Sequence, residues 1–253
     1  MNKKLAFSYF IIGILLVANS CFKFDSKKIT EKNKREEGKG FAVVELFTSE
    51  GCSSCPPADE AVGKLLKRNI DKTYILSFHV DYWNRLGWKD KFSKQEYTAR
   101  QGVYAKKMAL ESIYTPQIIV NGTSEFVGSN EIALNNAVNN GIKNGSLSNL
   151  NITVLRKNNS LTINYNIIDA GALFLNCAIV LPEANTQVKR GENGGRNLKH
   201  VNVVMDLKII ETKGSGELTM DIPKELIDKP FKVIAFSQAK QNLKILGADE
   251  VNL

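Results

Sequence analysis

The sequence predicts an α/β layer domain followed by a small antiparallel all-β sandwich domain, preceded by a short export segment. In residues 41–148, short apolar runs alternate with stretches that have helical periodicity, which is typical of an α/β layer structure. After a linker rich in Gly, Ser and Asn at 141–148, residues 149–253 show alternating strands and turns without a long helix. An apolar run near the N-terminus, at residues 5–18, follows two lysines.

Lysines followed by an apolar run and small residues give this N-terminal segment the layout of a signal peptide over residues 1–20. The apolar run is too short for a comfortable transmembrane helix. Small residues then lead to Cys21, and the residues Val-Ala-Asn-Ser-Cys at 17–21 resemble a bacterial lipobox. In such a lipoprotein-type signal Cys21 is lipidated and anchors the chain to a membrane. The alternative is a plain secretory signal that is cleaved nearby. We therefore expect an exported protein of the bacterial cell envelope, lipid-anchored in the periplasm or on the outer membrane.

Residues 21–40 are polar and of mixed charge, with almost no apolar residues to bury, which predicts a flexible charged tether. The whole chain has a formal net charge of +8. The basic residues of the tether lack interleaved aromatic residues, and the chain carries an export signal, so we expect no nucleic-acid partner.

Within residues 41–148 the order of elements is strand, helix, strand, helix, strand, hairpin and helix. The expected strands are 41–47, 73–80, 117–120 and 125–127, and the expected helices are 56–68, 94–110 and 130–142. Residues 93–96 form a capping-box pattern, and Asn121-Gly122 indicates a hairpin turn. In the second domain, the polar, Gly-rich segment 189–197 predicts a solvated surface loop or a surface that binds a partner.

Chemistry is indicated by the motif Cys52-Ser53-Ser54-Cys55, which lies between a predicted strand and a predicted helix. Free N–H groups and the helix dipole favour a thiolate at this position. Cys52, which we expect to be the more exposed, would attack a protein or small-thiol disulfide, and Cys55 would resolve the mixed disulfide. The disulfide closes only a tiny loop and would add little stability, so a redox role is favoured. No cofactor beyond this pair is expected.

The order of elements and the Cys motif resemble thioredoxin, and the resemblance implies two further features of the site. A cis-proline is implied at Thr115-Pro116, where Tyr114, Thr115 and Pro116 would contact substrate. From its place in the loop after the second predicted strand, Trp83 is a candidate for the rim of the site, with core packing as an equal alternative. Glu45 is implied as a buried acid that helps proton transfer from Cys55, although an outward-facing residue of an edge strand is an equal alternative. The sequence departs from thioredoxins in Gly51 and in the Ser-Ser dipeptide, which leaves the reduction potential open.

His79 ends the second predicted strand, near the same edge of the sheet as the cysteines. It is a weak candidate to tune the thiolate or to join both cysteines as a metal ligand, for example for Cu(I). A hydrogen-bonded strand histidine is the alternative. His200 is interpreted as structural, and Cys177 as a buried apolar residue.

Four segments together resemble the bacterial DUF1223 family of exported proteins, over a range from Phe41 to near the C-terminus. They read VVELFTSEGCSSCPPAD, SFHVDYWNRLGWKD, YTPQIIVNG and RGENGGRNL. This resemblance implies a thioredoxin-like fold and no established activity. The leading functional hypothesis is therefore an envelope thiol–disulfide oxidoreductase. The alternatives are a non-enzymatic envelope lipoprotein that binds or assembles partners and a thiolate protein that binds Cu(I).

Overall fold

In the computed structural model of the chain, the structure describes residues 40–146, 148–168 and 171–253. The predicted signal peptide, Cys21 and the tether up to residue 39 lie outside these residues. Within them, no helix is long and apolar enough to cross a membrane. The elements are β1 (Ala42–Thr48), α1 (Pro56–Lys67), β2 (Thr73–His79), η1 (Asn84–Leu86), α2 (Gln95–Lys107), β3 (Gln117–Val120), β4 (Ser124–Val127), α3 (Glu131–Asn144), β5 (Leu150–Lys157), β6 (Ser160–Ile167), β7 (Leu173–Gln187), β8 (Asn197–Thr212), β9 (Gly216–Asp221), η2 (Lys224–Leu226), β10 (Lys232–Ala239) and β11 (Ile245–Asn252).

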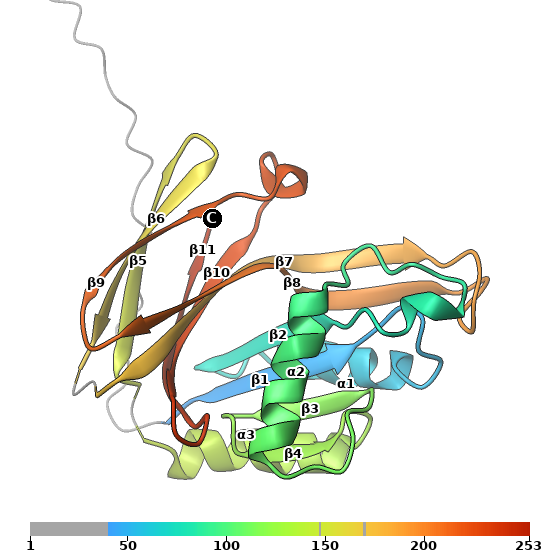
Figure 1. Cartoon of the computed structure of the whole chain (residues 1–253), viewed down its shortest axis with the longest axis horizontal. Helices are drawn as coiled ribbons and strands as arrows, with labels where there is room; N and C mark the ends of the chain where they lie inside the picture. Colours follow the sequence, from blue (N-terminus) through green and yellow to red (C-terminus); the bar gives the residue numbers. More distant parts are fainter. Residues whose placement is uncertain (1–39, 147, 169–170) are drawn as a thin grey trace, which may run out of the picture. The chain divides into compact units, whose positions relative to one another are not determined.

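One mixed sheet runs through both halves of the described chain, as Figure 1 shows. It has eight strands in the order β11-β10-β7-β8-β2-β1-β3-β4, and β5, β6 and β9 form a separate three-stranded sheet. The described residues are mostly β, with three α-helices. The predicted thioredoxin-like α/β domain followed by a separate β-sandwich is therefore wrong, because β7, β8, β10 and β11 belong to the same sheet as β1–β4.

The two halves of the sheet join where β8 lies parallel to β2. Ser77 pairs with Val203, and the Ser77 hydroxyl donates a hydrogen bond of 2.7 Å to the carbonyl of Val201. β7 and β8 form a long antiparallel hairpin that extends past this junction. Alternation of apolar residues indicates which face of a strand is buried, but not which strand it pairs with. The sequence therefore predicted strands in the second half but assigned them to the wrong sheet.

Predictions that depend on residues close together in the sequence are mostly confirmed. The three predicted helices and the first four strands are present, with ends shifted by a few residues. β3 and β4 pair as the predicted hairpin, and Asn121 and Gly122 have φ angles of 51° and 69°, as this turn requires. The predicted capping box does not form, because Lys94 is the N-cap of α2 and the Ser93 hydroxyl donates instead to the carbonyl of Asp90 at 2.8 Å.

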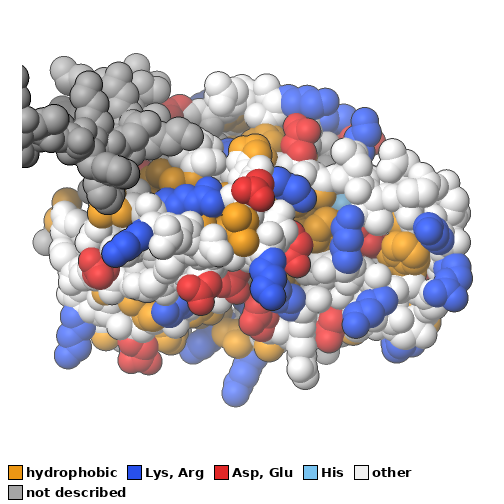
Figure 2. All heavy atoms as spheres, turned by 90° about the horizontal axis from the view of Figure 1, so that it is seen from above, with side chains coloured by type: hydrophobic (Ala, Val, Ile, Leu, Met, Phe, Trp, Pro, Cys, Tyr) orange, Lys and Arg blue, Asp and Glu red, His pale blue; other side chains and the backbone are white. Residues whose placement is uncertain are grey.

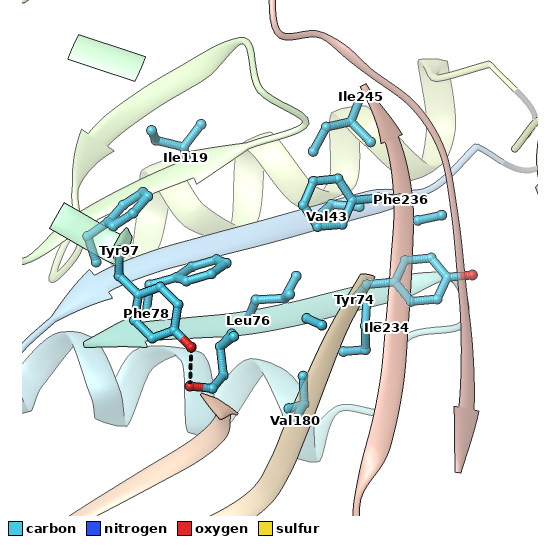
Figure 3. Packing of buried hydrophobic residues seen from close by; sticks show 14 of the residues in the cluster. Val43, Tyr74, Leu76, Phe78, Tyr97, Ile119, Val180, Ile234, Phe236 and Ile245 are labelled. Atoms are coloured by element: carbon cyan, nitrogen blue, oxygen red, sulfur yellow. Dashed lines mark hydrogen bonds between the residues drawn. The ribbon is translucent and has the colours of Figure 1, made fainter. Parts of the chain in front are cut away.

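β1 is buried on both faces. Ala42, Val44 and Leu46 belong to a core with α1 and α3, whereas Val43 and Phe47 belong to a core with α2 and with β7, β8, β10 and β11. Figure 3 shows this second core, where Tyr97 of α2 packs edge-on against Phe78 and donates a hydrogen bond to the carbonyl of Val204. A further core lies between the three-stranded sheet and β7 and β10.

A buried ion pair lies in the core on the α2 face of β1. The Arg100 guanidinium donates to both carboxylate oxygens of Glu45, at 2.6 and 3.0 Å, and to the amide oxygen of Asn176 on β7 at 3.0 Å. Tyr104 also donates to Glu45, and Gln238 on β10 donates to the Tyr104 hydroxyl at 2.8 Å. Burial opposes the charged form of Arg100, but the negative charge of the nearby Glu45 outweighs this and raises the pKa of Arg100 above its ordinary value. The network connects β1, α2, β7 and β10.

We expect Arg100→Met to lower the free energy of unfolding by about 3–5 kcal/mol, because it leaves the buried Glu45 without its counter-charge. Urea denaturation of the purified protein measures this loss. Lys64→Met, which removes a solvent-exposed ion pair with Glu60 and Glu131, is the matched control and should cost much less. Similar losses for the two variants would contradict a stabilising role for the buried pair.

Candidate functional site

The two motif cysteines form a disulfide at the start of α1. Their Cα atoms are 5.4 Å apart, Cys55 is the N-cap residue, and Pro56 is the first residue of the helix. The relative exposure is 0% for Cys52 and 1% for Cys55. The expectation that Cys52 is the more exposed cysteine is therefore wrong in this disulfide form, in which both sulfurs are covered.

Two of the four predicted substrate-contact residues lie at the disulfide. The Thr115 hydroxyl donates to Sγ of Cys52 at 3.3 Å, and the Trp83 indole donates to the Thr115 hydroxyl at 2.8 Å. The Thr115–Pro116 peptide bond is cis, as the resemblance implied. Pro116 is buried, and the Tyr114 hydroxyl donates to Glu125 rather than toward the cysteines.

Glu45, the predicted proton-transfer acid, faces away from the disulfide. The Thr48 hydroxyl donates to Asp59 on α1 at 3.0 Å, so Thr48 points to the α1 face of β1. Successive side chains of a strand point to opposite faces, and Glu45 therefore lies on the α2 face, where it pairs with Arg100. The structure does not bring Glu45 together with Cys55.

A cluster of buried ionisable groups lies beneath the motif instead. Its first part is a pair between Nδ1 of His79 and the Asp90 carboxylate, at 2.7 Å. Asp90 also accepts from the backbone N–H of Glu50 at 2.9 Å. The side chain of Glu50 is itself buried and accepts from the Trp88 indole at 2.7 Å. The pair thus positions the residue two places before Cys52.

The second part of the cluster is a pair between Nδ1 of His200 and the Asp59 carboxylate, at 3.0 Å. The ring centroids of His79 and His200 are 4.7 Å apart, and Nε2 of His200 lies 3.9 Å from Oε1 of Glu50. These two atoms and Nε2 of His79 are buried without a hydrogen-bond partner. In the described part of the chain, no three His, Cys, Asp or Glu side chains are arranged to hold a metal ion. Through the hydrogen bond from Nδ1 to Asp90, His79 is a hydrogen-bonded strand histidine.

The pKa values of the first pair move in opposite directions. Burial opposes the imidazolium of His79, but its pKa is raised because of the charge of Asp90 and the hydrogen bond to it, with smaller contributions from Asp59 and Glu50. Burial also opposes the carboxylate of Asp90, but His79 and two backbone N–H groups lower its pKa. Both directions favour an ion pair.

The loop between β7 and β8 covers the motif. The Asn193 side chain donates to the carbonyls of Glu50 and Cys52, both at 2.9 Å, and Glu192 accepts from the backbone N–H of Ser53 at 3.1 Å. Gly191 has a φ of 76°, and a Cβ atom there would lie 3.2 Å from Cβ of Trp88. Only glycine suits both this backbone conformation and the close approach.

Sequence reasoning missed several of these residues. Asp59 follows Cys55 by four residues and so shares its helix face, a spacing that the sequence shows. Nothing in the sequence around Asp90 or Glu50 indicates that either residue belongs to the site. The Gly-rich composition around Asn193 did indicate a loop, but the position of this loop depends on the β7–β8 register.

Comparison with known proteins gives a family and two similar structures. A family described as "Protein of unknown function (DUF1223)" matches residues 43–238. The crystal structure of protein AGR_C_4864 from Agrobacterium tumefaciens is 28% identical, with a TM-score of 0.65, over 83% of this chain and 93% of that one. HBP35 of Porphyromonas gingivalis is 19% identical, with a TM-score of 0.60, over 87% of this chain and 77% of that one, and shows similarity of fold alone. No curated protein matches the chain.

Asp90→Asn tests the charge on the buried His79. The raised pKa of His79 contributes folding stability that is fully present below about pH 6.5, its pKa in the unfolded chain. This stability is lost as the pH rises through the pKa of His79 in the folded protein. The lowered pKa of Asp90 contributes stability that is present above about 4 and is lost at lower pH. The difference in unfolding free energy between the wild type and Asp90→Asn should therefore be largest between about pH 4 and 6.5 and should decline at higher pH.

Urea denaturation at a series of pH values measures this difference. A constant part, from the lost hydrogen bonds to the backbone of Glu50 and Phe92, should remain at every pH. A difference that is the same from pH 4 to pH 9 would show that His79 is neutral in the folded protein.

Proposed function

The chain belongs to the DUF1223 family, whose function is unknown, and we propose that it is a thiol–disulfide oxidoreductase that uses Cys52 and Cys55. The observation that carries this proposal is the position of the disulfide at the N-terminus of α1, with a hydrogen-bond donor from Thr115 directed at Sγ of Cys52. A disulfide across three residues adds little stability through chain entropy, so stabilisation is a poor reason for its presence.

The surroundings of Cys52 favour its thiolate over its thiol. The N-terminal end of a helix carries a partial positive charge, which stabilises an anion there. The Thr115 hydroxyl lies 3.3 Å from Sγ of Cys52, and the Ser54 hydroxyl lies at the same distance. Hydrogen bonds to the charged form lower the free energy of the thiolate. We therefore assign Cys52 as the nucleophile and Cys55 as the resolving cysteine.

The proposed reaction transfers two electrons from the dithiol to a substrate disulfide. The Cys52 thiolate attacks one substrate sulfur and forms a mixed disulfide with it, while the substrate S–S bond breaks and the other substrate sulfur leaves as a thiolate that takes up a proton. The Cys55 thiol gives its proton to solvent and attacks Sγ of Cys52, which forms the Cys52–Cys55 disulfide and releases the second substrate thiolate. The reverse sequence oxidises a substrate dithiol. The reduction potential of the pair determines the direction.

Access to the disulfide requires movement of a covering group, since neither sulfur is exposed. Ser53 and Ser54 of the motif are exposed, and Ser53 is held by the exposed Glu192 through one hydrogen bond. The β7–β8 loop also holds the motif through the two hydrogen bonds that Asn193 donates, so its displacement would break three hydrogen bonds.

We place this activity in the cell envelope, and the proposal rests on the export-type segment at residues 1–20 and the lipobox-like residues before Cys21. Disulfides persist in such compartments, where dithiol–disulfide exchange has substrates.

The Cys55→Ser variant should accumulate a mixed disulfide with a peptide disulfide substrate, because Cys52 can still attack but nothing resolves the product. The Cys52→Ser variant should accumulate little. Mass spectrometry of the alkylated, non-reduced protein measures both adducts. Cys177→Ala is the control and should behave like the wild type, because burial raises the pKa of the Cys177 thiol to about 12. Equal trapping by the two motif variants, or none, would refute the assignment.

Thr115→Val should slow the alkylation of reduced Cys52 at a pH where most of the thiol is protonated. A hydrogen bond to a charged group contributes about 1.5–3 kcal/mol, so the thiolate fraction should fall about tenfold or more. The pH dependence of iodoacetamide alkylation measures this fraction. Thr123→Val, at an exposed position in the β3–β4 turn, is the matched control. An unchanged alkylation profile in Thr115→Val would show that the hydroxyl does not stabilise the thiolate.

A further inference from the structure

A carboxylate of the protein itself binds the backbone between the two cysteines. Oε2 of Glu192 accepts a hydrogen bond of 3.1 Å from the backbone N–H of Ser53, which lies between the two cysteines. Hydrogen bonds from Ser53 lower the pKa of Glu192, although the side chain is exposed to solvent. The backbone donor next to the reactive pair therefore holds a carboxylate, supplied from within the chain.

Two segments contact the motif or the residues just before it, and their exposed charges are almost all positive. Residues 82–92 contain a single acid, Asp90, which is buried. Residues 188–199 contain a single acid, Glu192 itself. The exposed basic residues of these two segments are Arg85, Lys89, Lys91, Lys189, Arg190, Arg196 and Lys199. An anionic partner at Ser53 would therefore find several cations and no exposed carboxylate but Glu192 in these two segments.

Contacts between the two segments place four of these cations around the motif. Gly191 lies against Trp88 and the carbonyl of Leu86, which brings Arg190 near the segment that carries Arg85 and Lys89. Arg196 donates a hydrogen bond of 3.0 Å to Asn193, which in turn holds the backbone of Cys52.

Within the described residues, Arg85, Lys89, Arg190 and Arg196 form no ion pair with a carboxylate of the protein. Figure 2 shows Lys and Arg side chains gathered at the end of the molecule where Figure 1 places the β7–β8 hairpin. Unpaired cations around a cleft or edge attract anions and raise the rate of their association.

We propose that the site acts on disulfides within acidic peptide segments, and that a substrate carboxylate replaces Glu192 at the N–H of Ser53. The other substrate carboxylates pair with Arg85, Lys89, Arg190 and Arg196. Because these cations come from two adjacent segments, 82–92 and 188–199, and are several in number, they fit a chain with several carboxylates better than a single small anion. This inference rests on the proposed function of Cys52 and Cys55.

The test compares the rates at which the reduced full chain reduces three disulfide-bridged peptides. The peptides have the same length and the same bridge, and their flanking residues are all Glu, all Ser or all Lys. We expect the Glu peptide to react at least about tenfold faster than the Ser peptide at low ionic strength, the Lys peptide to react more slowly, and the advantage to fall as salt is added.

Charge reversal locates the effect. Lys89→Glu combined with Arg190→Glu should lower the ratio of the Glu-peptide rate to the Ser-peptide rate to about one or less. Lys143→Glu combined with Lys157→Glu changes the net charge equally at distant exposed positions, and should leave this ratio unchanged. Glu192→Gln should raise the Glu-peptide rate, because it removes the charge of the internal competitor.

The outcomes separate this inference from the proposed function. If all three peptides are reduced at similar rates, or if both double variants change the ratio equally, the preference for acidic peptides is wrong and the redox function stands. If oxidised glutathione gains as much as the Glu peptide from the same cations, the partner is a small anion and not an extended peptide. If no peptide is reduced at all, the proposed function fails as well.

Discussion

Carboxylates buried at the carboxyl ends of β1 and β2 must find partners, because an unpaired buried charge has a large free-energy cost. Asp90 pairs with His79 at the end of β2, and Asp59 of α1 pairs with His200 of β8. These two pairs connect segments that are far apart in the sequence, and the second of them ties the β7–β8 hairpin to the helix that begins at Cys55. The tip of the hairpin consequently lies on the disulfide, and the site depends on this arrangement.

The same requirement explains why Glu45 is not part of the site. It is buried on the opposite face of β1, where Arg100 provides the counter-charge and Tyr104 a further hydrogen bond. The pair connects α2 to the strands of both halves of the sheet, which is a structural task. The ionisable groups nearest the motif are instead those of the cluster beneath it, which the chain assembles from α1, β2, β8 and the loop that contains Asp90.

What the sequence predicted correctly is local. The motif between β1 and α1, the Asn121-Gly122 hairpin and the helix that Asn130 caps each depend on residues within a few positions of one another. The fold class was wrong because it depends on the pairing of β8 with β2, which alternating apolar residues do not encode. Asn193 could not be assigned for a similar reason, since it contacts a carbonyl 143 residues earlier in the chain. Asp59 could have been found from its spacing to Cys55.

The reduction potential of the Cys52–Cys55 pair tests the central claim most directly, because redox activity requires a disulfide that thiols can open. Equilibration of the purified chain with glutathione buffers of known composition, followed by alkylation and mass spectrometry, measures it. The account predicts a value between about −270 and −120 mV, the range of catalytic dithiols. A value below about −300 mV, typical of structural disulfides, would contradict the account and would assign the pair a role in holding the turn.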